Sequence, residues 1–249
     1  AEAHDLPVFG HMLLWDYRTP AWMFTDENGD PLPRREGMQN LQTYIHRVVS
    51  RYKGRLAGWN VVNEAISDDP GEYLRQTAAY RSIGPDYVEL AFRFAHDADP
   101  DTPLYYNDYN LVVPEKREKT LRLIRELKAS GARLDAIGMQ GHWLLGFPKV
   151  EWIHDSMNAF AAEGIDIFVT ELDVDVLPRT VTGANMETVD EGPNPYPDGL
   201  PESVQQELAQ TYHDFFAAML AHPELKMITF WGSHDGRSWL NNFPVTGRT

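Results

Sequence analysis

Short apolar runs alternate with amphipathic stretches along the whole chain. Runs rich in β-branched and aromatic residues predict strands, whereas apolar residues recurring at helical spacing predict helices. The predicted strands cover 8–15, 59–63, 104–107, 136–140, 165–170 and 227–231. The predicted helices cover 38–52, 87–98, 114–130, 150–163 and 203–221. Strict alternation of this kind favours an α/β fold in which helices cover a parallel sheet.

Polar residues gather immediately after the predicted strands. They are Asp16, Glu64, Asp108, His142, Glu171 and Asp235. The carboxyl ends of the strands are where chemistry is normally built in a parallel barrel, so we expect these side chains to share one rim. A doubly wound open sheet is the alternative. The first strand is not followed by a glycine-rich phosphate turn, which makes that alternative weaker.

Two of these strand ends carry a glutamate. The apolar run 59–62 stops at Asn63 and Glu64, and the run 165–170 stops at Glu171. Two carboxyl groups that face each other across a barrel mouth can break a glycosidic bond. A separation of about 5–5.5 Å implies retention of anomeric configuration, and about 6.5–9.5 Å implies inversion. The alternative is that both glutamates lie on the surface and cap helices.

Composition narrows the classes of partner. The 249 residues suit one large α/β domain, and we expect a single catalytic domain over 1–249. Aromatic residues make up 12% of the chain, including seven Trp, and supply stacking surfaces for sugars as well as core. The net charge of −15 argues against nucleic acid and anionic membranes as partners. The absence of cysteine excludes disulfides and thiolate metal sites, and we see no membrane-spanning run.

Seven short motifs occur in a fixed order along the chain. They lie at 10–15 (Gly-His-Met-Leu-Leu-Trp), 59–64 (Trp-Asn-Val-Val-Asn-Glu), 106–110, 138–142, 170–173, 230–232 and 235–239. Together they resemble the motifs of glycoside hydrolase family ten, the endo-β-1,4-xylanases. The resemblance implies a TIM (β/α)8-type barrel. The chain would hold about six of the eight βα units, strands three to eight, and would be truncated at both ends.

The resemblance also implies roles for individual residues. Glu64 would be the general acid/base and Glu171 the nucleophile, with the pKa of Glu64 raised so that it is protonated near neutral pH. Gln140 and His142 would hold Glu171, and Asn63 would donate to the sugar 2-hydroxyl. The implied substrate-binding residues are His11, Trp15, Asn63, Gln140, His142, Trp231 and Trp239. For His142 and the two last tryptophans, ordinary packing in the core is the alternative.

The chain departs from the family pattern after Trp15. Asp16 stands where the family commonly has a histidine, and Arg18 stands where a glutamine is common. An extra carboxylate near the cleft would shift the pKa of the catalytic pair, but we favour a structural salt bridge between Asp16 and Arg18. Asp173 and Asp175 give only a weak metal signal. We therefore expect neither a metal nor a cofactor.

The resulting prediction is a retaining endo-β-1,4-xylanase that acts on xylan or xylo-oligosaccharides. Two alternatives stay open: another retaining β-1,4-glycanase, or a xylan-binding remnant with little activity because its barrel is incomplete. Open barrel edges would expose apolar lining, and oligomerisation is one way to cover them. A polymeric substrate cannot readily cross a membrane, so we expect a secreted or periplasmic protein.

Overall fold

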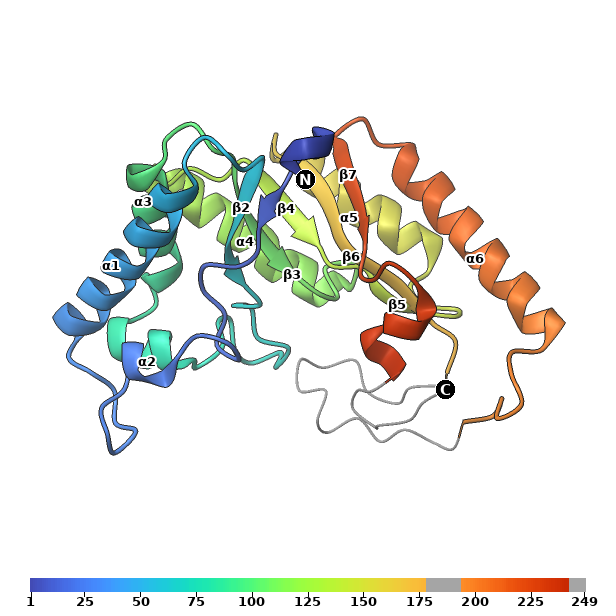
Figure 1. The fold of residues 1–249 in the computed structure, drawn as a ribbon, viewed down its shortest axis with the longest axis horizontal. Helices are drawn as coiled ribbons and strands as arrows, with labels where there is room; N and C mark the ends of the chain where they lie inside the picture. The colour runs from blue at the N-terminus through green and yellow to red at the C-terminus, as the bar shows by residue number, and fades with distance from the viewer. Residues whose placement is uncertain (178–193, 242–249) are drawn as a thin grey trace. The chain divides into compact units, whose positions relative to one another are not determined.

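The computed structural model describes residues 1–177 and 194–241 (Figure 1). The chain divides into two compact units. The N-terminal unit comprises Ala1–Asp108 and Lys119–Gly138, and the C-terminal unit comprises Tyr109–Glu118 and Met139–Thr249. The single catalytic domain expected over 1–249 stays a prediction.

The N-terminal unit is built on parallel strands covered by helices. Its strands are β1 (Phe9–Gly10), β2 (Gly58–Asn63), β3 (Leu104–Asp108) and most of β4 (Ala136–Met139), in the sheet order β1-β2-β3-β4. Its helices are α1 (Arg34–Tyr52), α2 (Ala78–Ile83), α3 (Tyr87–Ala98) and most of α4 (Pro114–Ser130). Strand β2 pairs in parallel with both β1 and β3, so its carboxyl end lies at the centre of this group.

Helix α1 shows how the apolar pattern directs packing in this unit. Leu41, Ile45 and Val49 recur every four residues and are fully buried where α1 packs on α3. Burying each such side chain contributes about 1.5–3 kcal/mol. Helix α3 in turn packs on β2 and β3, which fixes the strand that precedes Glu64.

The C-terminal unit has the same layered construction. It contains β5 (His142–Leu144), α5 (Val150–Ala162), β6 (Asp166–Asp175), α6 (Glu202–Leu220) and β7 (Leu225–Phe230). Strand β6 lies between β5 and β7 and is parallel to both. Helix α5 packs on α6 and on β6, and the Trp143 ring of β5 meets the Phe215 ring of α6 edge-on at 4.8 Å.

Several elements differ from the sequence prediction. Strand β6, expected to stop before Glu171, runs to Asp175, so Glu171 lies inside the strand instead of after its end. Helix α2 was missed because it has only six residues; the Thr77 side chain caps it by accepting from the Tyr80 N–H, and Gly84 ends it with φ 111°. Strand β5 was missed because it is short and follows Gly141, whose φ is +84°. The first strand, expected over 8–15, is formally two residues long, although Leu13 and Leu14 still donate backbone hydrogen bonds to β2.

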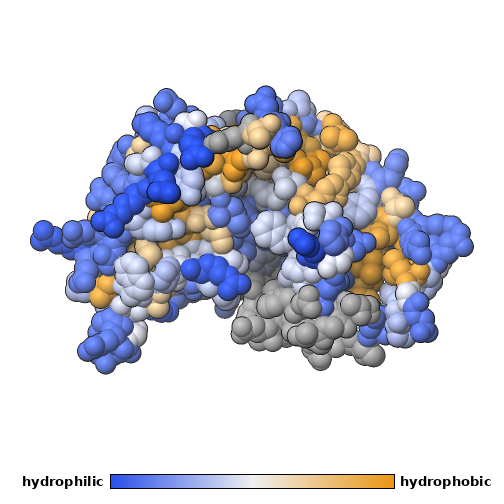
Figure 2. All heavy atoms as spheres, in the orientation of Figure 1, coloured by the Kyte–Doolittle hydropathy of each residue, from blue (hydrophilic) through white to orange (hydrophobic). Residues whose placement is uncertain are grey.

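Apolar side chains are exposed on the C-terminal unit. Leu220 at the end of α6 is 67% exposed and Phe230 at the end of β7 is 52% exposed. Figure 2 shows apolar surface over this α6 and β7 region. Oligomerisation stays a prediction. Among the described residues, no helix is both long and apolar enough to cross a bilayer.

Candidate active-site residues

Glu64 follows β2 at a point where the strand is irregular. Asn60 pairs with Tyr105, but Val62 pairs with Tyr106, so β2 carries one extra residue. Bulges of this kind re-aim side chains and are common beside active sites. The backbone of Glu64 has φ +57°, a left-handed conformation that costs a non-glycine residue about 1–3 kcal/mol. Two hydrogen bonds hold it there, from Glu64 N–H to the Asn107 carbonyl and from Arg75 Nε to the Glu64 carbonyl, both 2.9 Å.

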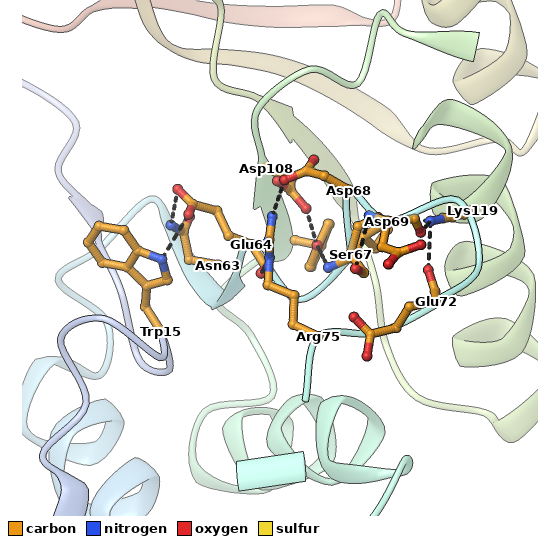
Figure 3. A network of polar contacts seen from close by, with 12 residues as sticks. Trp15, Asn63, Glu64, Ser67, Asp68, Asp69, Glu72, Arg75, Asp108 and Lys119 are labelled. Carbon is orange, nitrogen blue, oxygen red and sulfur yellow. Dashed lines mark hydrogen bonds and ion pairs between the residues drawn. The ribbon is translucent and has the colours of Figure 1, made fainter. Parts of the chain in front are cut away.

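Both oxygens of the Glu64 carboxyl group accept side-chain hydrogen bonds (Figure 3). Trp15 Nε1 donates to Oε2 at 3.0 Å, and Asn63 Nδ2 donates to Oε1 at 3.1 Å. Glu64 is 9% exposed, so its carboxyl group is largely shielded from water. The structure thus brings together three residues that the sequence singled out, Trp15, Asn63 and Glu64.

A chain of buried amides orients Asn63. Its Oδ1 accepts from Asn60 Nδ2 at 3.0 Å and from Asn107 Nδ2 at 2.9 Å. Because both neighbours donate to the oxygen, the amide NH2 of Asn63 must face Glu64. Asn60 Nδ2 also lies 3.1 Å from His11 Nδ1, which connects His11 to the same chain. Asn60 and Asn107 were missed as members of the site, although both stand in the motifs that carry the resemblance.

The loop after Glu64 is fastened at several points (Figure 3). Arg75 forms an ion pair with Asp68 at 2.8 Å, and Lys119 of α4 donates to the backbone carbonyls of Ser67, Asp69 and Glu72. The loop after Glu64 is therefore bonded to the backbone of Glu64 through Arg75 and to α4 through Lys119. This bracing limits how far Glu64 can move.

Glu171 lies within β6, again at an irregular point. Val169 pairs with Ile228 and Leu172 pairs with Phe230, so β6 carries one residue more than β7 between these pairs. The Glu171 N–H donates to the Gln140 carbonyl at 2.8 Å, and Glu171 is only 5% exposed. Both glutamates are therefore buried and lie close to a bulge in a parallel strand.

His142 lies between two carboxyl groups. Its Nε2 is 3.2 Å from Glu171 Oε2, and its Nδ1 is 2.9 Å from Asp173 Oδ1. Burial lowers the pKa of His142, but the hydrogen bonds and charges of Asp173 and Glu171 outweigh burial and raise that pKa to about 9. With both ring nitrogens donating, His142 supplies positive charge beside Glu171 at neutral pH.

Two tryptophans complete the surroundings of His142. Trp239 Nε1 donates to Asp173 Oδ2 at 2.6 Å, and its ring centroid is 5.1 Å from that of His142. Trp231 meets the same imidazole edge-on at 6.3 Å. Asp173 was missed as a site residue. The sequence did hold a sign of its role: Asp173 lies two residues after Glu171, and residues two apart in a strand point to the same face.

The predicted salt bridge between Asp16 and Arg18 is wrong. Asp16 Oδ1 instead accepts from the Ala78 N–H at 3.1 Å, at the start of α2. A helix leaves its first N–H groups without internal partners, and a carboxylate is a favourable acceptor for them. Arg18 lies elsewhere, with its Cζ 5.7 Å from the centre of the Trp15 ring.

The two carboxyl groups differ in the donors that surround them. Glu64 receives an indole and an amide, both neutral, whereas Glu171 contacts an imidazole of raised pKa. Any N–H donor favours the ionised form of a carboxyl group, and a cationic donor favours it more strongly than a neutral one. Across residues 1–177 and 194–241, no group of three or more His, Asp or Glu side chains is arranged to hold a metal ion.

Comparison with known proteins shows which family this chain is similar to. The sequence profile described as glycosyl hydrolase family 10 matches residues 1–249. The chain is 46% identical to Endo-1,4-beta-xylanase A of Xylanibacter ruminicola over 255 residues, covering 100% of this chain and 69% of that protein. It is 38% identical to Endo-1,4-beta-xylanase B of Paenibacillus barcinonensis, covering 100% and 72%.

A solved structure shows the same fold. A GH10 endoxylanase retrieved from a sugarcane soil metagenome matches with a TM-score of 0.91 and 36% identity, covering 100% of this chain and 72% of that one. The expected fold class, a (β/α)8-type barrel of which this chain holds only a part, is thereby confirmed.

Proposed function

The chain belongs to glycosyl hydrolase family 10, and from this membership we propose that it hydrolyses internal β-1,4-xylosidic bonds of xylan with retention of configuration. Glu64 is the general acid/base in this proposal and Glu171 is the nucleophile. The observation that carries the proposal is the match over residues 1–249 to a family whose relatives are named endo-1,4-beta-xylanases.

The proposed reaction has two displacements. In the first, a Glu171 oxygen attacks the anomeric carbon, the bond to the leaving sugar oxygen breaks, and Glu64 gives that oxygen its proton. In the second, water attacks the same carbon, Glu64 takes the proton from water, and the Glu171 carboxylate leaves. Two inversions at one carbon give net retention.

The surroundings of each carboxyl group support this division of roles. His142 places positive charge beside Glu171, which suits a group that must attack as an anion. Trp15 and Asn63 fix the orientation of the Glu64 carboxyl group without adding charge, which suits a group that cycles between protonated and ionised forms. His11, Gln140, Trp231 and Trp239 complete the proposed sugar-binding surfaces.

Two assays separate this proposal from its alternatives. We expect reducing sugar to be released from xylan and little from carboxymethylcellulose, with the β-anomer as the first product by NMR. Release from carboxymethylcellulose at an equal rate would indicate a different β-1,4-glycanase. Binding to xylan in gels without any hydrolysis would indicate a binding protein. Because xylan is a polymer, we place this activity outside the cytoplasm.

Replacing His142 by glutamine tests the charge proposed beside Glu171. We expect kcat on xylan to fall by about 10²-fold, the usual cost of losing one well-placed donor. His142 has a folded-state pKa of about 9 against an ordinary value of 6.5, so its stabilising contribution is present below 6.5 and is lost as pH rises through about 9. Melting temperatures measured across that range should therefore fall less steeply for His142→Gln than for the wild type.

His213 offers a matched control in the same unit. It lies on α6, and its side chain is 74% exposed. His213→Gln should keep both the wild-type activity and the wild-type pH dependence. Unchanged kcat in His142→Gln, or an equally steep loss of stability above pH 6.5, would contradict the role given to His142.

A further inference from the structure

The turn after Trp15 presents two side chains that the proposed reaction does not use. The N–H groups of Arg18 and Thr19 donate to the Trp15 carbonyl at 3.0 and 2.8 Å, and the Trp15 N–H donates to Thr19 Oγ1 at 3.1 Å. These bonds fix a tight turn, so Tyr17 and Arg18 project from a rigid support. We call these two residues the Tyr17–Arg18 pair.

Tyr17 is an exposed aromatic side chain close to the proposed acid/base. Its ring centroid is 5.7 Å from that of Trp15, at an interplanar angle of 61°, and the residue is 49% exposed. Burial raises the pKa of the Tyr17 hydroxyl, Arg75 opposes that shift and Glu64 adds to it. Tyr17 therefore lies within electrostatic reach of Glu64 while leaving part of its ring open to a ligand.

Arg18 is an exposed cation stacked on the same tryptophan. Its Cζ lies 5.7 Å from the centre of the Trp15 ring. Within the described residues it has no carboxylate partner, because Asp16 is bonded to the backbone of α2 instead. In a protein of net charge −15, this leaves positive charge beside the residue that contacts Glu64.

We propose that the Tyr17–Arg18 pair binds an acidic sugar, a uronic acid carried as a side group on the xylan backbone. The proposal rests on the proposed function and deepens it, because it names a substrate feature that this chain selects. The guanidinium would pair with the uronate carboxylate, and the open face of Tyr17 would pack on a sugar ring. Together they would favour decorated over plain xylan at this turn.

The chemistry of the two side chains narrows the choice of ligand. A guanidinium group matches a carboxylate with two parallel hydrogen bonds, and it meets only single acceptors in neutral hydroxyl groups. An aromatic face packs well against the C–H groups of a sugar. An arabinose side group would use only the second feature. A uronic acid uses both, so it is the ligand that this pair fits.

Binding measurements test this inference apart from catalysis. The affinity is measured by calorimetry in the Glu171→Gln background, which should not cut its ligand, for two xylo-oligosaccharides of the same backbone length, one plain and one bearing a glucuronic acid. Arg18→Gln should weaken binding of the glucuronic acid form by about threefold to tenfold, the range expected of a charged hydrogen bond discounted for solvent exposure. Binding of the plain form should change by less than about twofold.

Further variants separate recognition from a general effect of charge. Arg55 is also exposed and stacks on an aromatic ring, with its Cζ 6.0 Å from the centre of the Tyr52 ring, and it precedes β2 whereas Glu64 follows that strand. Arg55→Gln should leave both affinities unchanged. Tyr17→Ala should weaken binding of the glucuronic acid form, and Tyr17→Phe should restore it, since stacking needs no hydroxyl group. Raised salt should shrink the effect of Arg18→Gln, because the contact is partly exposed.

Specific outcomes would overturn the inference. Equal loss for plain and glucuronic acid forms in Arg18→Gln would show that Arg18 supports the fold or Trp15 alone, and no loss for either form would show that it does not meet substrate. Hydrolysis of the plain oligosaccharide by the wild type is recorded in separate samples. Absence of that hydrolysis would contradict the proposed function, whereas the difference in affinity alone decides the inference.

Discussion

Glu171→Gln is expected to lower kcat on xylan by about 10⁴-fold or more. The amide keeps the size and hydrogen-bonding capacity of the side chain but cannot form an ester with the anomeric carbon. His142, now without one of its two carboxylate partners, should show a lower pKa, because Glu171 is one of the groups that raise it. Initial rates on xylan and an NMR titration of the His142 ring would measure the two effects.

The same substitution at an exposed glutamate of the C-terminal unit is the control for Glu171→Gln. Glu151 lies in the first turn of α5 in the same unit and is exposed. Glu151→Gln should keep wild-type rates, since an exposed helix glutamate contributes little to stability or chemistry. If Glu171→Gln retained more than about one tenth of wild-type activity while remaining folded, the assignment of Glu171 as nucleophile would be wrong.

Glu64→Ala should reveal its role through the leaving group. On xylan, whose leaving sugar needs a proton, we expect a fall of about 10²–10⁴-fold. On dinitrophenyl β-xylobioside, whose leaving group needs no proton, formation of the covalent intermediate should remain fast. Its breakdown should be slow, because no base activates water. A burst of dinitrophenolate followed by slow turnover would measure this directly.

Added azide sharpens the test of Glu64. Azide needs no general base and can enter the space left by the missing carboxyl group, so it should speed turnover and yield the β-xylobiosyl azide. Glu72, in the loop after Glu64, supplies a control, and Glu72→Ala should show neither the burst nor the azide effect. Absence of the burst on the dinitrophenyl substrate would contradict a role for Glu64 in proton transfer, because it would show that formation of the intermediate slows even when the leaving group needs no proton.

Much of the fold could be predicted from hydrophobic patterns. Helix α1 was expected because apolar residues recur at helical spacing between 38 and 52. Three of them, Leu41, Ile45 and Val49, form the buried stripe where α1 packs on α3. Strand β2 was expected because 59–62 is a short apolar run rich in β-branched residues. In the structure all six residues of the strand are buried. Long, strongly periodic segments carry enough information within themselves to specify their type.

Other features depend on partners distant in the chain, so the local pattern could not reveal them. Asp16 bonds to Ala78 rather than to nearby Arg18, because α2 offers an unpaired N–H group that only the folded chain brings close. The amide chain through Asn60 and Asn107 depends on the register between β2 and β3. The bulges beside Glu64 and Glu171 likewise appear only when neighbouring strands are aligned.

The most direct test of the central claim is to identify the carboxyl group that becomes esterified during turnover. The protein is incubated with an activated xylobioside that carries fluorine next to the anomeric carbon, which slows breakdown of the intermediate. Mass spectrometry of the digested protein should then find the added sugar on Glu171, with no label in Glu171→Gln. Labelling of a different carboxyl group, or an α-configured first product from unmodified substrate, would contradict the account.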